Sequence, residues 1–286
     1  MYLCTLMTPR IFLFTIGFMV CSVLAKAQVF YRLSEFGLAG GSAHYFGDLN
    51  PNIGFKETGY NAGFFYKYNA TEYIALKGSM NYAHIGYDDK FSNNPYQQLR
   101  NLNFQNNIWE FFFQTEFHFF RYNIGDFDHR FTPYVSVGMG AIRHNPYTFY
   151  DGKRYDLRPL GTEGQNYDQY KDRRYNPWAV ALPIGIGFKY WWNGGFTVSA
   201  ELVNRLCTTD YIDDVSTTYV DANLFVDPQP GPYPTAASQL QDRSVEVSTT
   251  AFGKPGRQRG VSTTKDQYLM FQLGVSMRLP TYKCPK

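Results

Sequence analysis

The stretch WEFFFQTEFHF, residues Trp109–Phe119, decides the fold because its side chains change character with a period of two. One face carries Trp109, Phe111, Phe113, Thr115, Phe117 and Phe119, and the other carries Glu110, Phe112, Gln114, Glu116 and His118. This period is typical of a β-strand whose two faces meet different environments. The stretch therefore predicts a strand with rings on one side and polar groups on the other.

Seven further segments repeat this alternation. The predicted strands are Glu35–Tyr45, Tyr60–Tyr68, Ile74–Tyr87, Ile108–Arg121, Pro133–Ile142, Trp178–Tyr190, Phe196–Leu206 and Gln267–Leu279. Short or moderate connections alternate with long ones at about 88–107, 143–177 and 207–266. This pattern predicts an all-β fold, an eight-stranded antiparallel transmembrane up-and-down β-barrel with short periplasmic turns and long extracellular loops. A soluble β-sandwich, which also alternates, is the alternative.

Aromatic residues near the strand ends predict two girdles at membrane interfaces. The girdle on the short-turn side would contain Tyr66, Tyr68, Tyr73, Tyr122, Tyr190 and Trp191. The girdle on the long-loop side would contain Tyr45, Tyr60, Tyr82, Tyr87, Trp109, Trp178 and Tyr268.

The composition and the N-terminus exclude several classes of protein. Aromatic residues make up 19% of the 286 residues, too many for a disordered chain, and the net charge of +3 is too small for a nucleic-acid binder. Arg10, the apolar stretch Ile11–Ala25 and the Ala25-Lys26-Ala27 site predict a signal peptide over residues 1–27. Residues 28–286 would then form a single barrel domain, exported to the bacterial outer membrane and in contact with its lipid.

Charged side chains on the inward face predict a charge network inside the barrel. The set is Glu35, Lys67, Lys77, Glu110, Glu116, Lys189, Glu201, Arg205 and Arg278. An eight-stranded barrel has an interior that side chains fill, and buried charges are costly unless they are paired. We therefore expect a salt-bridged plug rather than a selectivity filter or a proton path.

Candidate catalytic and metal-binding residues are few. Ser42 and His44 lie two residues apart on one predicted strand, which could bring a nucleophile to a base and loosely resembles outer-membrane lipid deacylases, but no third residue can be assigned. The cluster Asp210, Asp213, Asp214 and Asp221 could hold calcium, yet its spacing favours a solvated acidic loop. The sequence therefore predicts no catalytic residue, no metal site and no cofactor.

Two motifs resemble a known family. Gly41–Asn50 (GSAHYFGDLN) and Thr209–Ser216 (TDYIDDVS) are similar to the Bacteroidota outer-membrane barrel family that includes PorG, as are Pro133–Gly140 and the Phe-rich fourth strand. The motif residues whose role is open are Gly47, Asp48, Asn50, Asp210, Tyr211, Asp213 and Asp214. The resemblance implies a component of the type IX protein secretion machinery, in some systems linked to gliding motility, with the PorK lipoprotein and the PorN ring as partners. It supplies no catalytic residues.

The leading hypothesis is therefore a non-enzymatic barrel that docks or organises the periplasmic ring complex at the outer membrane. A surface barrel that binds a ligand or partner through loops 143–177 and 207–266 is one alternative. A lipid-modifying barrel enzyme that uses Ser42 and His44 is the other.

Overall fold

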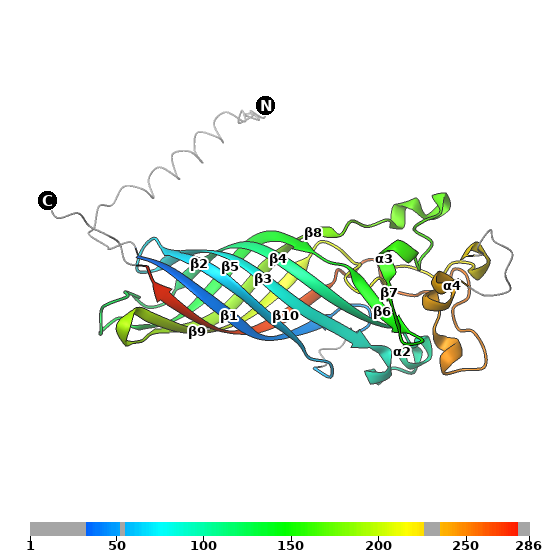
Figure 1. The fold of residues 1–286 in the computed structure, drawn as a ribbon, viewed down its shortest axis with the longest axis horizontal. Coiled ribbons are helices and arrows are strands. Elements are labelled where there is room, and N and C mark those ends of the chain that lie inside the picture. The colour runs from blue at the N-terminus through cyan, green and yellow to red at the C-terminus, as the bar shows by residue number, and fades with distance from the viewer. Residues whose placement is uncertain (1–32, 52–54, 226–234, 280–286) are drawn as a thin grey trace, which may run out of the picture. The chain divides into compact units, whose positions relative to one another are not determined.

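The computed structural model describes residues 33–51, 55–225 and 235–279, so the predicted signal peptide lies outside the described residues. Antiparallel strands form the barrel wall (Figure 1). They are β1 (Leu33–Phe46), β2 (Gly59–Asn69), β3 (Ile74–Asp88), β4 (Asn103–His118), β5 (Phe131–Arg143), β8 (Trp178–Trp191), β9 (Phe196–Cys207) and β10 (Gln267–Arg278).

The sheet closes on itself. Each strand pairs with its neighbour in the order β3-β2-β1-β10-β9-β8-β5-β4, and β3 then pairs with β4 from Ile74↔Phe117 to Asp88↔Asn103. Each wall strand therefore has two partners, which a sandwich of two open sheets does not allow. The predicted all-β, eight-stranded antiparallel barrel is confirmed.

The clearest difference from the predicted strands is at β4. It begins at Asn103 rather than Ile108 and ends at His118 rather than Arg121. The early start has a cause in pairing, because β3 pairs with β4 as far as Asp88↔Asn103. On the other side, Gln105 and Asn106 pair with β6 (Pro146–Tyr150), which forms a hairpin with β7 (Lys153–Asp156) inside a predicted loop. Backbone pairing therefore extends β4 through a polar stretch that carries no apolar alternation.

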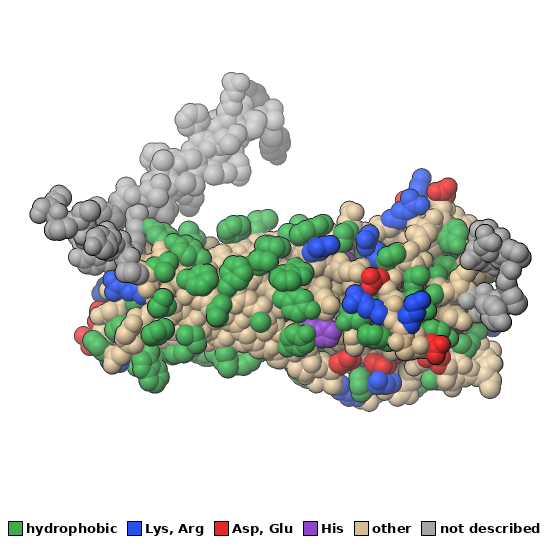
Figure 2. All heavy atoms as spheres, viewed as in Figure 1, with side chains coloured by type: hydrophobic (Ala, Val, Ile, Leu, Met, Phe, Trp, Pro, Cys, Tyr) green, Lys and Arg blue, Asp and Glu red, His purple; other side chains and the backbone are tan. Residues whose placement is uncertain are grey.

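The outside of the barrel is apolar. Phe113, Leu38 and Ile186 are 78%, 64% and 61% exposed, and the polar residues between the outward positions are buried. Figure 2 shows hydrophobic side chains along the barrel wall, whereas Lys, Arg, Asp and Glu gather at the long-loop end. An exposed apolar surface of this extent is unusual for a protein surface in water.

The predicted aromatic girdles are only partly correct. Tyr66, Tyr73, Tyr60, Trp109 and Trp178 do point outward. Tyr68, Tyr82 and Tyr190 are half-buried at outward-facing positions. The remaining side chains are buried inside, so their assignment to a girdle was wrong: Tyr45, Tyr87, Tyr122, Trp191 and Tyr268. The cause is parity, because a residue at an even spacing from an inward residue also faces inward. Trp191, two residues after the buried Lys189, is an example, and its neighbour Trp192 is 63% exposed instead.

Short helical segments occupy the connections. They are η1 (Asp89–Phe91), α2 (Pro95–Arg100), α3 (Leu157–Leu160), η2 (Asp168–Arg173), η3 (Asn193–Gly195), η4 (Ala222–Phe225), α4 (Ala236–Gln241) and η5 (Ser244–Glu246). Figure 1 shows α2, α3, α4, β6 and β7 together at one end of the barrel. Within the described ranges, every helix is too short or too polar to cross a membrane.

Candidate functional site

A carboxylate between two ammonium groups lies inside the barrel. Glu116 on β4 contacts Lys67 of β2 at 3.0 Å and Lys189 of β8 at 2.9 Å, and all three side chains are buried. His118 Nε2 lies 2.6 Å from Lys189 Nζ, and its Nδ1 faces the Glu72 carbonyl at 3.0 Å. A carbonyl only accepts, so Nδ1 donates and Nε2 is free to accept from the ammonium. This histidine therefore adds a neutral acceptor to the charge network.

A second buried ion pair joins β3 to β9. Lys77 Nζ lies 2.6 Å from Glu201 Oε2, and Ser136 donates a hydrogen bond of 2.7 Å to Glu201 Oε1. Glu35 on β1 accepts from Asn69 Nδ2 at 2.7 Å. Each of these buried carboxylates therefore has a donor at contact distance, as the cost of burying charge requires.

A third group lies toward the long-loop end of the wall. Glu110 accepts from Arg205 at 3.4 Å, from Asn81 Nδ2 at 3.0 Å and from the Tyr268 hydroxyl. The Arg205 guanidinium also lies 4.5 Å from the centre of the Phe112 ring. The sequence interpretation placed Tyr268 in a girdle, although its parity with the inward Gln272 was a usable signal.

Of the nine predicted interior charges, Arg278 does not join the network. It is half-buried at the short-turn end, and no ion pair within the described residues involves it. Rings fill space between the others: Phe65 lies 5.3 Å below both Lys67 Nζ and Lys77 Nζ. Paired charges and rings therefore fill this part of the interior, as expected for a barrel of eight strands.

The family-motif residues lie in the loop layer, which we define as the described residues of 47–58, 89–102, 144–177 and 208–266. Asp48 Oδ2 accepts from the Val261 backbone N–H at 2.9 Å, and burial raises the pKa of Asp48 to about 6. Asn50 Nδ2 donates a hydrogen bond of 2.7 Å to the Tyr45 carbonyl. A Cβ at Gly47 would lie 2.1 Å from the Tyr45 hydroxyl oxygen, so only glycine fits there. The first motif therefore ties the loop after β1 to the end of the chain's last long loop.

Two buried carboxyls share one hydroxyl at the centre of this layer. The Tyr45 hydroxyl lies 2.6 Å from Asp213 Oδ2 and 2.9 Å from Asp266 Oδ1. One hydroxyl has one proton to donate, and an ionised carboxylate can only accept. The second contact is therefore a hydrogen bond only if one carboxyl carries a proton. Burial raises the pKa of both Asp213 and Asp266 well above the usual range, and repulsion from Asp48 adds to the increase at both.

The other acidic residues of the second motif are also buried and hydrogen-bonded. The Ser216 hydroxyl donates a hydrogen bond of 2.5 Å to Asp210. Burial raises the pKa of Asp210 to about 7. The hydroxyls of Thr162 and Tyr175 donate hydrogen bonds of 2.5 Å and 2.6 Å to the two carboxylate oxygens of Asp214. Burial raises the pKa of Asp214 to about 6. The motif carboxyls therefore connect two long loops.

Cations that the sequence interpretation did not single out complete the layer. Arg259 Nη1 contacts Glu163 Oε1 at 3.1 Å, and the Tyr211 hydroxyl donates a hydrogen bond of 3.4 Å to the same carboxylate. Arg100 forms two bonds with Asp89, of 2.7 Å and 2.8 Å. All four charged side chains are nearly fully buried. No local signal marks these partners, because the members of each contact lie in different loops or at the two ends of one loop.

The prediction of a solvated acidic loop was wrong. Asp210, Asp213 and Asp214 are 3%, 1% and 0% exposed, and only Asp221 of this cluster is on the surface. The loop folds back onto the barrel mouth, where hydroxyls and backbone N–H groups replace water as donors. Across the described part of the chain, no group of three or more His, Cys, Asp or Glu side chains is arranged to hold a metal ion.

Ser42 and His44 lie together on the outer face of β1. Their Oγ and Nε2 atoms are 3.3 Å apart, and the β1–β10 register runs through Gly40 and Gly41 without a bulge. His44 Nδ1 has no hydrogen-bond partner among the described residues. A base needs a group that orients its ring, so the arrangement lacks the third member of a catalytic triad there.

Comparisons with known proteins found one family model and several similar solved structures. Solved structures that are similar include Ail, the attachment invasion locus protein of Yersinia pestis (10% identity, 87% of this chain and 99% of that chain, TM-score 0.39). Neisserial surface protein A is similar too (8% identity, 86% of this chain and 97% of that chain, TM-score 0.41). So is the N-terminal β-barrel domain of Pseudomonas aeruginosa OprF (12% identity, 87% of this chain and 99% of that chain, TM-score 0.36). No curated protein matches the sequence. The model of a domain of unknown function, DUF6089, matches residues 10–224, and because this is most of the sequence, the chain belongs to the DUF6089 family.

Proposed function

We propose that the chain is a non-enzymatic outer-membrane barrel that anchors and docks partner proteins rather than transporting solutes. The observation that carries this proposal is the ion-paired interior, in which Glu116 lies between Lys67 and Lys189 at 3.0 Å and 2.9 Å. A transport path would need these side chains to separate, and separating buried charges is costly.

The wall of the barrel supports a location in a lipid bilayer. Its strands are 11 to 16 residues long, enough for the apolar band of an outer-membrane barrel. The exposed Phe113, Leu38 and Ile186 would contact acyl chains. A bilayer would remove this apolar surface from water, which favours insertion. The predicted signal peptide is consistent with export to the outer membrane.

We further propose that the partners belong to the type IX secretion machinery, with the PorK lipoprotein and the PorN ring as the periplasmic contacts. This assignment rests on the resemblance of Gly41–Asn50 and Thr209–Ser216 to the family that includes PorG. The hydrogen bond of 2.6 Å from the Tyr45 hydroxyl of the first motif to Asp213 of the second supports a shared loop architecture, because it joins the two motifs. A periplasmic ring would meet the short turns, including Trp192–Gly195.

Cross-linking in the native host tests this proposal. A peptide inserted next to Gly194 in the β8–β9 turn should abolish cross-linking to PorK and PorN and reduce secretion. The same peptide inserted in η2, at the exposed Asp168, is the matched control and should change neither. Normal secretion after deletion of the gene, or recovery of no ring component from the unmodified protein, would refute the type IX assignment.

A partner-binding surface at the long-loop end is the second candidate function. Phe149, Val245 and Val247 are 50%, 60% and 55% exposed on the loop layer, and large exposed apolar side chains often mark contact sites. Under this candidate, the double variant V245S/V247S reduces the adhesion of cells that display the protein while secretion is unchanged. Under the docking function at the turns, both readouts match the wild type.

A further inference from the structure

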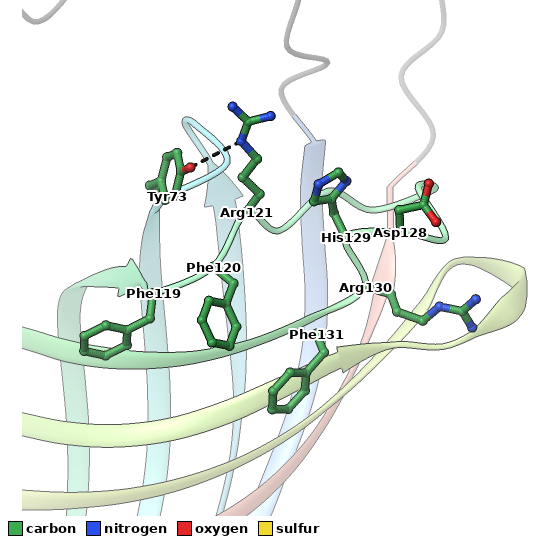
Figure 3. Close-up of a pocket in the computed structure, with 8 residues that line it drawn as sticks. All are labelled: Tyr73, Phe119, Phe120, Arg121, Asp128, His129, Arg130 and Phe131. Carbon is green, nitrogen blue, oxygen red and sulfur yellow. Dashed lines mark hydrogen bonds between the residues drawn. The ribbon is translucent and has the colours of Figure 1, made fainter.

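A groove at the short-turn end combines apolar rings with charged groups. It has a volume of about 550 Å³ and lies where β4 ends and β5 begins. Figure 3 shows the rings of Phe119, Phe120 and Phe131 beside the strand ends, while Arg121 and Asp128 lie beyond them in the turn. The groove is therefore apolar on the side of the wall and charged on the side of the turn.

The apolar part exists because the alternation of β4 stops at its last residue. Phe119 and Phe120 are consecutive, yet they are 55% and 56% exposed, and Phe131 across from them is 45% exposed. Phe119 N–H still bonds to the Pro133 carbonyl at 3.0 Å, whereas Phe120 N–H bonds to the Thr132 hydroxyl at 3.1 Å. Two adjacent rings are thereby turned to the same side of the wall, as a contact with acyl chains requires.

The charged part holds one cation and one anion with unused hydrogen-bonding capacity. Arg121 uses only its Nε, which lies 3.3 Å from the Tyr73 hydroxyl and 3.5 Å from Glu72 Oε2. Its two terminal nitrogens have no hydrogen-bond partner within the described residues. The exposed carboxylate of Asp128 likewise accepts no hydrogen bond from any described residue, although the backbone N–H of Asp128 donates one to the Asp126 carboxylate. A ligand could therefore satisfy both groups.

We propose that this groove binds a zwitterionic phospholipid with a primary ammonium group, of the phosphatidylethanolamine type. The phosphate would accept from the paired terminal N–H groups of Arg121, a geometry that suits a guanidinium. The ammonium would donate to Asp128, and the acyl chains would lie along the three phenylalanine rings. This inference rests on the proposed membrane location.

The exposed carboxylate of Asp128 favours a zwitterion over an anionic lipid. The lining of the groove contains the cations Arg121 and Arg130 and one carboxylate, Asp128, and two further carboxylates lie at its edge, Glu72 beside Arg121 and Asp126 beside His129. An anionic headgroup would offer no cation to Asp128, whereas the ammonium of a zwitterion would donate to it. Free phosphate would not account for the rings, because it buries no apolar surface.

Competition between lipids in nanodiscs tests the proposal. The full-length mature protein is reconstituted into equal mixtures of phosphatidylethanolamine and phosphatidylcholine, and native mass spectrometry counts the lipids that remain bound. Phosphatidylcholine has the same phosphate but no ammonium N–H, so it isolates the contact to Asp128. We expect the wild type to retain phosphatidylethanolamine about tenfold over phosphatidylcholine, which corresponds to one lost charge-assisted hydrogen bond.

Matched variants separate this site from general lipid contact. Asp128→Asn should remove the preference, and Arg121→Gln should lower retention of both lipids at the groove. Arg154→Gln, an exposed arginine of the loop layer paired with Asp156, should change nothing. Equal retention of the two lipids by the wild type, or stronger retention of phosphatidylglycerol, would overturn the proposal even if the barrel is inserted. Failure of the protein to enter nanodiscs of any composition would instead refute the membrane location, and the lipid site with it.

Discussion

Replacing Glu116 by glutamine should destabilise the barrel strongly. The substitution keeps the size of the side chain but removes the carboxylate that contacts Lys67 at 3.0 Å and Lys189 at 2.9 Å. Among the described residues, no other carboxylate lies within ion-pair distance of either ammonium. Removing one partner of a buried ion pair costs about 3–5 kcal/mol, and here two buried cations lose the same partner. We expect a loss in this range or at its upper end.

Unfolding by guanidinium in detergent or lipid vesicles measures this loss, with heat-modifiable gel mobility as the readout of the closed barrel. The double variant E116Q/K189M removes one of the two buried ammonium groups that lose their carboxylate partner, and it should recover part of the lost free energy of unfolding. Asp168→Asn, at a fully exposed carboxylate, is the control and should leave the unfolding midpoint unchanged. An E116Q midpoint equal to that of the wild type would show that water reaches the lysines, and the closed interior would then be wrong.

Three further predictions concern the loop layer and the outer face. Burial raises the pKa of Asp48 to about 6 and of Asp210 to about 7 from the ordinary 3.8, so the folded loop layer holds protons that the unfolded chain releases. The stability of the loop layer should therefore fall as the pH rises from about 4 to about 7. We expect protease cleavage of the loops to be faster at pH 8 than at pH 5. Tyr45→Phe removes the hydroxyl shared by two buried carboxyls and should destabilise the layer by about 1–3 kcal/mol, measured by hydrogen exchange of the loops, whereas unchanged exchange would contradict the sharing. The double variant S42A/H44A should leave the acylation of outer-membrane lipids unchanged in mass spectra, and an altered acyl pattern would favour the enzyme alternative.

The period-two pattern predicted the wall and its facing, because facing is a local property of a strand. Glu110 and Glu116 were placed inside from their parity alone, and both are buried. Their partners could not be read in this way. Glu116 meets Lys67 and Lys189, which come from strands that are not adjacent to β4 in the sheet. Such contacts across the interior depend on the stagger of the closed barrel, which a single strand does not encode.

The loop layer was less predictable than the wall. Asp213 and Asp214 stand in a polar stretch with turn-forming neighbours, which favoured a solvated loop. Their burial depends on Tyr45 and Tyr175, which lie far away in the sequence. The early start of β4 was missed for a similar reason, since it depends on pairing with the end of β3 and with a hairpin that was itself part of a predicted loop.

The central claim, that the barrel wall lies in lipid, is tested most directly by quenching with brominated lipids. A fluorophore is attached to single cysteines at Phe113 and Leu273, which are 78% and 58% exposed on the wall, and at Lys90 in the loop layer, whose side chain is 62% exposed. In vesicles with bromine at the middle of the acyl chains, the labels at 113 and 273 should be quenched and the label at 90 should not. Equal fluorescence at all three positions would contradict the account.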